Sequence, residues 1–274
     1  MSESTKITIV TITYNSEKTI ERTIERTIQS IISQNYNNME YWIIDGVSKD
    51  HTMELVKKYA QKYSFIKYSS EPDRGISDAF NKGIGKATGE LIGLINSDDQ
   101  LAEGALVAVD KTFAMTGADV IYGDTIVNDI ANGLCLLKQA GNPKQLKYDM
   151  PFIHQSCFIR KIVYDQVGGY SENYKICMDY DMLARIFNRG YKFANANKIL
   201  SIFQYGGTSC QHPIKTINED MRIASKYGLN AGSIIVYKIK HVPINFLKLL
   251  LSKLKVWGWV YRRFKSKSIL EEEL

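Results

Sequence analysis

Two carboxylates directly follow an apolar segment and could take part in chemistry. Asp98 and Asp99 stand in Asn96-Ser97-Asp98-Asp99, after the apolar residues 91–95. Adjacent carboxylates at a strand end suit a hard divalent cation such as Mg²⁺ or Mn²⁺, which prefers oxygen ligands and retains water and substrate phosphates. Such a cation stabilises the charge that develops on a departing diphosphate. The same residues could instead cap a helix, which is the alternative when the segment is considered alone.

A third carboxylate, Asp179, lies in Met178-Asp179-Tyr180-Asp181, where we expect a helix to begin. In that position it can act as a general base that takes the proton from an attacking hydroxyl, a role worth about 10² to 10⁴ in rate. It could also simply complement the positive end of the helix dipole. His154 is a single histidine ahead of a segment with strand character, and such a residue is usually structural.

Asp45 and Tyr14 are candidates for a nucleotide pocket. Asp45 can accept a hydrogen bond from a base N–H, and the Tyr14 ring can pack on the base. A turn aspartate that bonds its own backbone is the alternative for Asp45. Neither a Gly-x-x-x-x-Gly-Lys-Ser/Thr nor a Gly-x-Gly-x-x-Gly motif follows the first apolar run. This counts against phosphate-loop kinases and dinucleotide dehydrogenases.

The elements that must position these residues alternate through the first 100 residues. We expect strands at residues 7–13, 41–44, 65–68 and 91–95, and helices at residues 17–34, 52–61 and 76–85. This alternation predicts an α/β fold with a mostly parallel central sheet covered by helices on both faces. Ligands of such sheets bind beyond the carboxyl ends of the strands. All the polar clusters fall there, namely Tyr14-Asn15, Asp45, Asp73-Arg74-Gly75 and Asp98-Asp99.

The alternation weakens after residue 100. We expect strands at residues 118–122 and 133–138, strand character at 154–160, and an amphipathic helix at 177–188 with Met182 and Ile186 directed inward. This half is α+β in style. Because no linker is visible before about residue 212, we expect it to complete one continuous domain.

Composition and cysteine spacing describe an ordinary folded protein. The 274 residues are 45% hydrophobic and 23% charged, and the four cysteines lie far apart without zinc-ligand spacing. We therefore expect reduced thiols in a cytosolic setting. The apolar run near the N-terminus is too short for a signal peptide, and no segment approaches the roughly 18 to 20 apolar residues of a membrane span. We expect a protein that neither enters the secretory route nor crosses a bilayer.

The basic character of the chain is concentrated near its C-terminus. Residues 221–270 contain 11 of the 35 Lys and Arg residues and no Asp or Glu. Around residues 246–259 the spacing suits an amphipathic helix that lies on an anionic membrane, where each basic residue contributes about 1 kcal/mol. The alternative is a helix packed on the rest of the chain with a solvated basic face. No nucleic-acid module accompanies the charge, so we expect no nucleic-acid partner.

Several motifs together carry a resemblance that none carries alone. They are Thr13-Tyr14-Asn15, Ile44-Asp45-Gly46, Asp73-Arg74-Gly75, Asn96-Ser97-Asp98-Asp99, His154-Gln155 and Asp179-Tyr180, in this order. Over residues 6–210 the series resembles family 2 glycosyltransferases, and most closely the bacterial members that build capsule, colanic-acid-type exopolysaccharide or O-antigen. The resemblance implies a GT-A fold, an inverting mechanism and a divalent cation, Mn²⁺ or Mg²⁺.

The resemblance also implies roles for individual residues. Asp98 would bind the metal, Asp179 would be the catalytic base, and the donor would be bordered by Thr13, Tyr14, Asn15, Asp45, Asp73, Lys82, Asn96 and Ser97. Asn96 stands where the family often has the first aspartate of Asp-x-Asp, and Met178 replaces an acidic residue that often precedes the base. Further contacts with donor or acceptor are expected from Asp99, His154, Gln155 and Gly207, the last in a glycine-containing loop.

The expected function is transfer of a sugar from a nucleotide-diphosphate donor, a UDP-sugar before a GDP-sugar, to a saccharide acceptor. We expect a lipid-linked acceptor and a location on the inner face of the cytoplasmic membrane. Residues 1–215 would form the catalytic domain, with a nucleotide-binding half (6–100) and an acceptor half (101–215), and residues 216–274 a basic helical tail. A sugar-nucleotide nucleotidyltransferase is the enzymatic rival, although it should carry a glycine-rich phosphate loop where Tyr14-Asn15-Ser16 stands. An inactive membrane-bound scaffold is the other rival, against which Asp98 and Asp179 argue.

Overall fold

The computed structural model describes residues 4–17, 24–207 and 212–228. Its strands are β1 (Ile7–Thr13), β2 (Met39–Asp45), β3 (Ile66–Ser70), β4 (Leu91–Leu94), β5 (Gln100–Leu101), β6 (Val120–Asp129), β7 (Leu134–Lys138), β8 (Cys157–Arg160) and β9 (Phe193–Gln204). Its α-helices are α1 (Ile24–Ile32), α2 (Thr52–Lys62), α3 (Ile76–Lys86), α4 (Ala105–Thr116), α5 (Lys161–Val167), α6 (Met178–Asn188) and α8 (Pro213–Tyr227). The 3-10 turns are η1 (Ile130–Asn132), η2 (Pro143–Lys147) and η3 (His154–Ser156).

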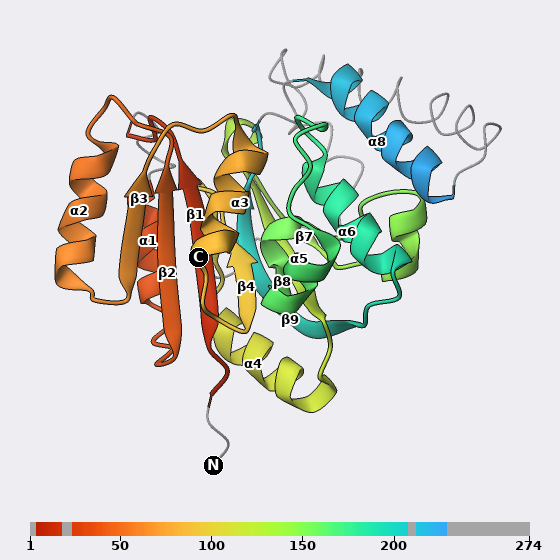
Figure 1. The fold of residues 1–274 in the computed structure, drawn as a ribbon, viewed down its shortest axis with the longest axis horizontal. Coiled ribbons are helices and arrows are strands. Elements are labelled where there is room, and N and C mark those ends of the chain that lie inside the picture. Colours follow the sequence, from red (N-terminus) through yellow and green to blue (C-terminus); the bar gives the residue numbers. More distant parts are fainter. Residues whose placement is uncertain (1–3, 18–23, 208–211, 229–274) are drawn as a thin grey trace.

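One mixed sheet runs through the described part of the chain in the order β3-β2-β1-β4-β8-β6-β9-β5, with β7 paired to β6 (Figure 1). The strands β3, β2, β1 and β4 are parallel to one another, as predicted for the first 100 residues. Beyond them β8 is antiparallel to both β4 and β6, while β9 is parallel to β6 and antiparallel to β5. The α/β fold class is therefore confirmed, and the mixed pairing belongs to the second half.

Helices cover both faces of the sheet because the strands alternate their side chains between two cores. In β1, Ile7 and Ile9 belong to the core beneath α1, α2 and α4, whereas Val10 belongs to the core beneath α3, α5 and α6. The β-branched residues of β1 suit a strand that is buried on both faces of the sheet. In α1 the buried Ile24, Ile28 and Ile31 recur at helical spacing.

The first half matches the predicted elements closely, and the second half differs. The described part of the predicted helix 17–34 runs from Ile24 to Ile32, and residues 18–23 lie outside the description. Helix α4 was not predicted because its apolar residues are spread around it, with Val107 57% and Met115 75% exposed. Strand β9 was not predicted because Asn195 and Asn197 interrupt its apolar pattern, and Asn197 has a positive φ of 51°.

The register of the parallel strands brings their carboxyl ends to one edge. Thr13 is the partner of Asp45, and Asp45 is the partner of Ser70. Strand β4 ends at Leu94 opposite Val10, so the chain from Asn96 onward continues beside the end of β1. The polar clusters predicted to share an edge of the sheet therefore do so.

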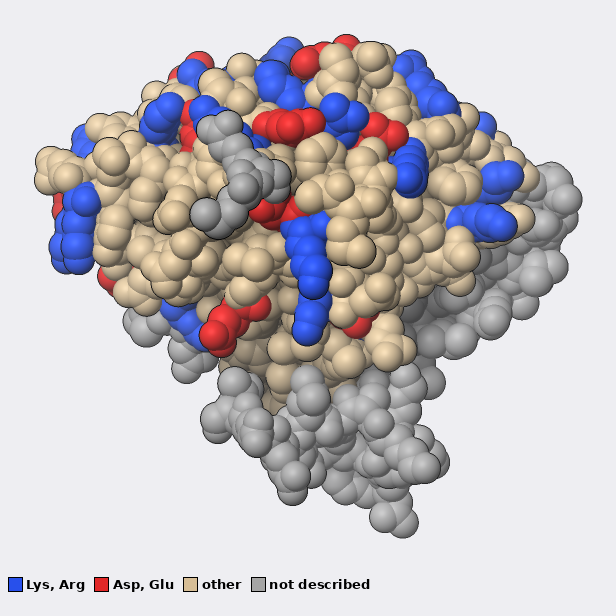
Figure 2. All heavy atoms as spheres, turned by 90° about the horizontal axis from the view of Figure 1, so that it is seen from below, with Lys and Arg blue, Asp and Glu red and all other residues tan. Residues whose placement is uncertain are grey.

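Helix α8 packs on α6 at the side of the sheet away from α2 (Figure 1). The predicted domain boundary at residue 215 falls within this helix, and the predicted amphipathic tail from residue 229 onward lies outside the described residues. In the part of the chain that is described, no helix has the length and apolar character needed to span a bilayer. Figure 2 shows one face of the molecule, on which basic and acidic side chains are interspersed.

Candidate active site

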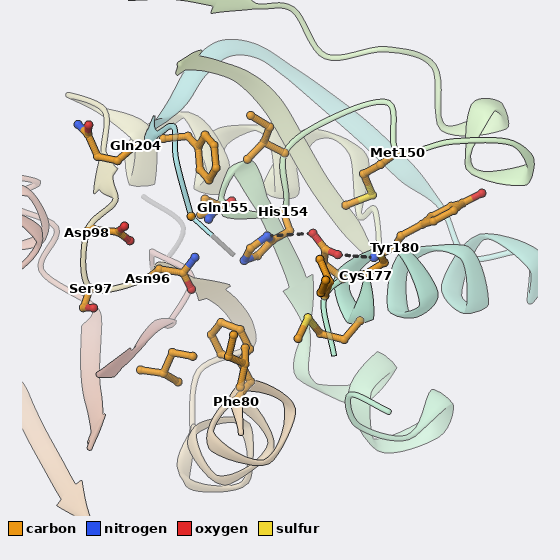
Figure 3. A pocket seen from close by; sticks show the side chains of 18 of the residues that line it. Phe80, Asn96, Ser97, Asp98, Met150, His154, Gln155, Cys177, Tyr180 and Gln204 are labelled. Carbon is orange, nitrogen blue, oxygen red and sulfur yellow. Dashed lines mark hydrogen bonds and ion pairs between the residues drawn. The ribbon is translucent and has the colours of Figure 1, made fainter. Parts of the chain in front are cut away.

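A cavity of about 990 Å³ opens at the carboxyl ends of the parallel strands and is lined by both halves of the sheet. Thr13 at the end of β1, Tyr14 directly after it and Asp73 in the loop after β3 line it, as do Asn96, Ser97 and Asp98 in the loop after β4. The opposite wall comes from the segments around η3 and the start of α6 (Figure 3). After the roles that the resemblance implies for Tyr14 and Asp179, we call the first wall the donor end and the second the base end.

Most of the residues singled out from the sequence meet in this cavity. Those that line it are Thr13, Tyr14, Asp73, Asn96, Ser97, Asp98, His154, Gln155, Asp179 and Gly207. Asn15, Asp45, Lys82 and Asp99 are not among the lining residues. Each of these four instead makes contacts that shape the surrounding loops.

Asp45 and Asn15 hold the two loops that follow β1 and β2. The fully buried Asp45 carboxylate accepts hydrogen bonds from the Ser48 N–H at 3.0 Å and from the Ser70 hydroxyl at 2.6 Å. The Asn15 N–H donates to the Ser48 hydroxyl, and Asn15 Oδ1 accepts from the Lys49 N–H, both at 2.8 Å. These contacts fix the rim from which the Tyr14 ring, 60% exposed, borders the cavity.

Gly46 permits the close approach of Asp73 to this rim. A Cβ atom at Gly46 would lie 2.5 Å from Asp73 Oδ2 and 3.4 Å from the Tyr14 ring. Asp73 Oδ1 accepts from the Gly75 N–H at 2.8 Å, and Gly75 has a φ of 117°, which favours glycine. Gly46 and Gly75 thus allow two turns to bring Asp73 to the donor end.

Lys82 is engaged away from the cavity. Its ammonium lies 3.1 Å from Asp78 Oδ2 and donates to the Pro72 carbonyl. Asp78 also pairs with Arg74 at 2.9 Å. In this arrangement Lys82 supports the loop that carries Asp73.

Asp99 is the buried centre of a network that joins the donor end to the base end. It is 1% exposed, and it accepts from Gln155 Nε2 at 2.5 Å, the Gln204 N–H at 2.9 Å and Asn96 Nδ2 at 3.1 Å. Burial, together with the charge of Asp98, raises the pKa of Asp99 to about 7, against the lowering effect of the hydrogen bonds from Gln204 and Gln155. Asp99 therefore fixes the loop from which Asp98 faces the cavity (Figure 3).

The side chains of His154 and Asp179 contact each other at the base end. His154 Nδ1 lies 3.2 Å from Asp179 Oδ2, and the two side chains are 15% and 26% exposed (Figure 3). Asp179 Oδ1 accepts from the Tyr180 N–H at 2.8 Å, and the His154 ring packs edge-on against Phe80 at 6.1 Å. The sequence leaves His154 either as a structural residue or as a contact to donor or acceptor, and the fold places it beside Asp179 in the cavity wall.

The start of α6 is clamped by a residue that sequence reasoning missed. The Glu219 carboxylate of α8 accepts from the N–H groups of Lys175, Ile176 and Cys177, at distances from 2.9 to 3.2 Å. These N–H groups lie at and just before the N-cap of α6, where no carbonyl of the helix accepts from them and an anion is stabilising. No local sequence motif predicts this contact, because 42 to 44 residues separate the partners.

Beyond Asp179 the cavity wall carries the carboxylates of Asp149 and Asp220. Burial and the charges of Asp149, Asp179 and Glu219 raise the pKa of Asp220 to about 7, while a hydrogen bond with Cys177 lowers it. Apolar side chains such as Met150 and Ile176 share this wall. The wall offers hydroxyl-binding groups between apolar surfaces.

The donor end fits a divalent cation that shares its ligands with a substrate. Within the described ranges, no group of three or more His, Cys, Asp or Glu side chains could hold a metal ion by itself. Asp98 nevertheless offers a carboxylate to the cavity beside the Asn96 amide. Mg²⁺ and Mn²⁺ accept such oxygen ligands, and a single carboxylate suffices for Mg²⁺ where substrate phosphates and water complete the shell.

Comparison with known proteins places the chain in a family. The family model described as "Glycosyl transferase family 2" matches residues 8–170. The chain is 24% identical to a PGL/p-HBAD biosynthesis glycosyltransferase of Mycobacterium bovis (76% of this chain and 82% of the relative) and 25% identical to the putative glycosyltransferase EpsE of Bacillus subtilis (73% of each).

Solved structures show the same fold. S. aureus TarS 1–349 in complex with UDP-GlcNAc has a TM-score of 0.61 at 17% identity over 96% of this chain and 76% of that chain. The mannosyltransferase PcManGT from Pyrobaculum calidifontis, in complex with GDP-Man and Mn²⁺, has a TM-score of 0.60 at 13% identity over 97% of this chain and 89% of that chain. The predicted GT-A fold is thereby confirmed, and the chain belongs to the family 2 glycosyltransferases.

Proposed function

We propose that the protein transfers a sugar, with inversion, from a nucleoside-diphosphate sugar to a hydroxyl of a saccharide acceptor. The observation that carries the proposal is the single cavity with Tyr14, Asp73 and Asp98 at one end and His154 with Asp179 at the other. A donor laid across it would present its diphosphate to Asp98 and its sugar to the base end. Transfer needs both groups within one substrate length, and a cavity of about 990 Å³ has room for a nucleotide sugar.

The donor end suits a nucleotide with an exposed base. The Tyr14 ring offers an aromatic face, while Thr13 and Asp73 offer polar groups to base and ribose. We favour a UDP-sugar because TarS is described with UDP-GlcNAc, and a GDP-sugar is the alternative because PcManGT is described with GDP-Man.

Asp98 would hold a divalent cation, Mn²⁺ or Mg²⁺, together with the donor diphosphate. When bound, the cation supplies Lewis-acid stabilisation of the departing nucleoside diphosphate. Asn96, which is held by Asp99, would lie beside the same phosphates. The Mn²⁺ described with PcManGT supports a metal in this fold.

The base end would activate the acceptor. The acceptor hydroxyl loses its proton to the pair formed by Asp179 and His154, and its oxygen attacks the anomeric carbon on the face opposite the diphosphate. The glycosidic bond forms as the bond to the diphosphate breaks, so an α-linked donor yields a β-glycoside. One base is sufficient for this direct displacement.

The acceptor would be a lipid-linked saccharide in the synthesis of a surface polysaccharide. One relative is named a PGL/p-HBAD biosynthesis glycosyltransferase and another a putative glycosyltransferase, EpsE, and they support a biosynthetic sugar transfer by analogy. The basic residues 221–270 would place the enzyme on the anionic inner face of the cytoplasmic membrane. No nucleic acid is proposed as a partner.

The test is nucleoside diphosphate release from a panel of UDP- and GDP-sugars in Mn²⁺, repeated in excess chelator. We expect release from at least one donor, its loss in chelator, and a β-linked product in the proton NMR spectrum when an α-linked donor meets a glycoside acceptor. A nucleotidyltransferase would instead exchange pyrophosphate with a nucleoside triphosphate, and an inactive scaffold would turn over none of the donors. Either result would contradict the proposal.

A further inference from the structure

The first turn of α6 carries Asp179 but receives no cap from its own part of the sequence. The N-cap residue, Cys177, makes no side-chain capping hydrogen bond, and Asp179 Oδ1 accepts from the N–H of its neighbour Tyr180 at 2.8 Å. The N–H groups at such a helix start need an acceptor from elsewhere in the fold. The position of the Asp179 carboxylate therefore depends on what else holds this turn.

Glu219 of α8 supplies the missing acceptor. Its Oε2 atom accepts from the N–H groups of Ile176 at 2.9 Å and Cys177 at 3.0 Å, and both its oxygens lie within 3.2 Å of the Lys175 N–H nitrogen. Hydrogen bonds to a carboxylate are stronger than those between neutral groups. One side chain thus orients the three residues that lead into the first turn, and its contacts end two residues before Asp179.

Further contacts hold α8 against α6, so that Glu219 is itself fixed in place (Figure 1). The Cys177 thiol donates to the Thr216 carbonyl at 3.5 Å, and Ile217 of α8 is buried. Further along α8, Lys226 Nζ lies 3.4 Å from Oδ1 of the buried Asp181 in the first turn of α6. The two helices are therefore joined at more than one point around the residue that carries the base.

Helix α8 also faces the substrate cavity. Thr216 and Asp220 line the cavity, whereas Glu219 is not among the lining residues. Glu219 thus lies behind the cavity wall and contacts the backbone that presents Asp179. This geometry separates a residue that could touch a substrate from one that can only act through its neighbours.

We propose that Glu219 is a positioning residue for the transfer reaction. It holds the start of α6 in the place where the Asp179 carboxylate meets the acceptor hydroxyl. A general base works only within hydrogen-bond reach of the proton that it takes, and a misplacement of about 1 Å can lower the rate by about 10²-fold. This inference rests on the proposed function, in which Asp179 acts as a base.

The test is a double-mutant cycle on the full chain with Glu219→Ala, Asp179→Asn and the combined variant. Nucleoside diphosphate release is measured with water as acceptor, in Mn²⁺, on a UDP- or GDP-sugar that the wild type hydrolyses. We expect Glu219→Ala to lower kcat by about 10- to 100-fold and to leave the donor KM within about twofold of the wild-type value. In the Asp179→Asn background the same change should alter kcat by less than about threefold, because Glu219 acts through Asp179.

Glu219→Gln is the second variant and decides the question if Glu219→Ala does not fold. The amide keeps one acceptor oxygen, but its NH₂ group cannot accept from the Lys175 N–H. We expect kcat to fall by about threefold to tenfold at an unchanged donor KM, and this loss should again disappear in the Asp179→Asn background. Asn218→Ala, at an exposed position of the same helix, is the matched control and should keep the wild-type kcat.

A wild-type kcat for the Glu219 variants would overturn the proposal. A loss of equal size in the wild-type and Asp179→Asn backgrounds, or a donor KM that rises together with the loss, would also overturn it, because these are the results of a general structural role. A wild type that releases nucleotide from no donor would instead overturn the proposed function, and the inference with it.

Discussion

Gln155 donates a hydrogen bond to Asp99 at 2.5 Å, although 56 residues separate them. Gln155 follows His154 in η3, and Asp99 follows Asp98 in the loop after β4. Both are almost fully buried. The bond therefore links the turn that carries His154 to the loop that carries Asp98.

Replacing Gln155 by Leu should damage both stability and turnover. The substitution removes a donor from the buried Asp99, and a buried group left without its partner costs about 1 to 3 kcal/mol. Urea denaturation measures the loss in the free energy of unfolding, and nucleoside diphosphate release measures turnover. Gln61→Leu, on the exposed surface of α2, is the matched control. A Gln155→Leu protein as stable and active as the wild type would show that the hydrogen bond to Asp99 contributes to neither property.

Asp98→Asn should weaken the binding of Mn²⁺ and lower the rate of turnover. The substitution preserves shape but removes the anionic oxygen that would bind the cation, so saturation with Mn²⁺ should require a higher concentration and kcat should fall by about 10² or more. The measurement is nucleoside diphosphate release as a function of Mn²⁺ concentration. An unchanged titration curve would exclude Asp98 as the ligand.

Gly46→Ala should raise the KM for the donor without unfolding the protein. The added methyl would meet Asp73 Oδ2 at 2.5 Å and displace that side chain from the donor end. Steady-state kinetics should show a KM several times higher, because a displaced contact of about 1 kcal/mol corresponds to roughly fivefold in affinity. Gly85→Ala in α3 meets no atom within 4 Å and serves as control. Equal KM values for the two variants would show that the close contact between Gly46 and Asp73 does not affect donor binding.

Glu40 stabilises the sheet away from the cavity, and its contribution should depend on pH. Burial acts to raise the pKa of Glu40, but the Lys67 ion pair and hydrogen bonds from Thr88 and Thr8 lower it to about 2. A lowered carboxyl pKa adds stability above the unfolded value of 4.5, and this stability is lost as pH falls from there towards 2.

Glu40→Gln should therefore lower the free energy of unfolding by about 1.5 to 3 kcal/mol at pH 7, and the difference from the wild type should shrink below pH 4.5. Denaturant titrations at several pH values measure it. Glu103→Gln, at an exposed position, should show neither effect. A difference that stays constant down to pH 3 would contradict the role of the carboxylate charge.

The sequence was most informative where short-range patterns decide the structure. The strand ends at Thr13 and Asp45 were predictable because β-branched runs stop at polar turns, and parallel strands then place those turns at one edge. Asp98 and Asp179 were predictable from the family resemblance, and both line the cavity.

Long-range contacts were not predictable in the same way. Glu219 reaches the start of α6 only because α8 returns to pack on it, and Gln204 reaches Asp99 across 105 residues. Lys82 is expected to border the donor, and in the structure its ammonium lies 3.1 Å from Asp78, one helical turn away. Local periodicity contains no information about the partners of Glu219 and Gln204, whereas the Asp78–Lys82 pair has the spacing of one helical turn.

The most direct test of one shared cavity is nucleoside diphosphate release as a function of donor concentration for the wild type, Tyr14→Ala and Asp179→Asn. Tyr14→Ala should raise KM about fivefold to 100-fold with little change in kcat, because stacking of a base on an aromatic ring contributes about 1 to 3 kcal/mol. Asp179→Asn should lower kcat at least about 100-fold and leave KM nearly unchanged. A wild-type kcat for Asp179→Asn, or an unchanged KM for Tyr14→Ala, would contradict the assignment of a donor end and a base end to this cavity.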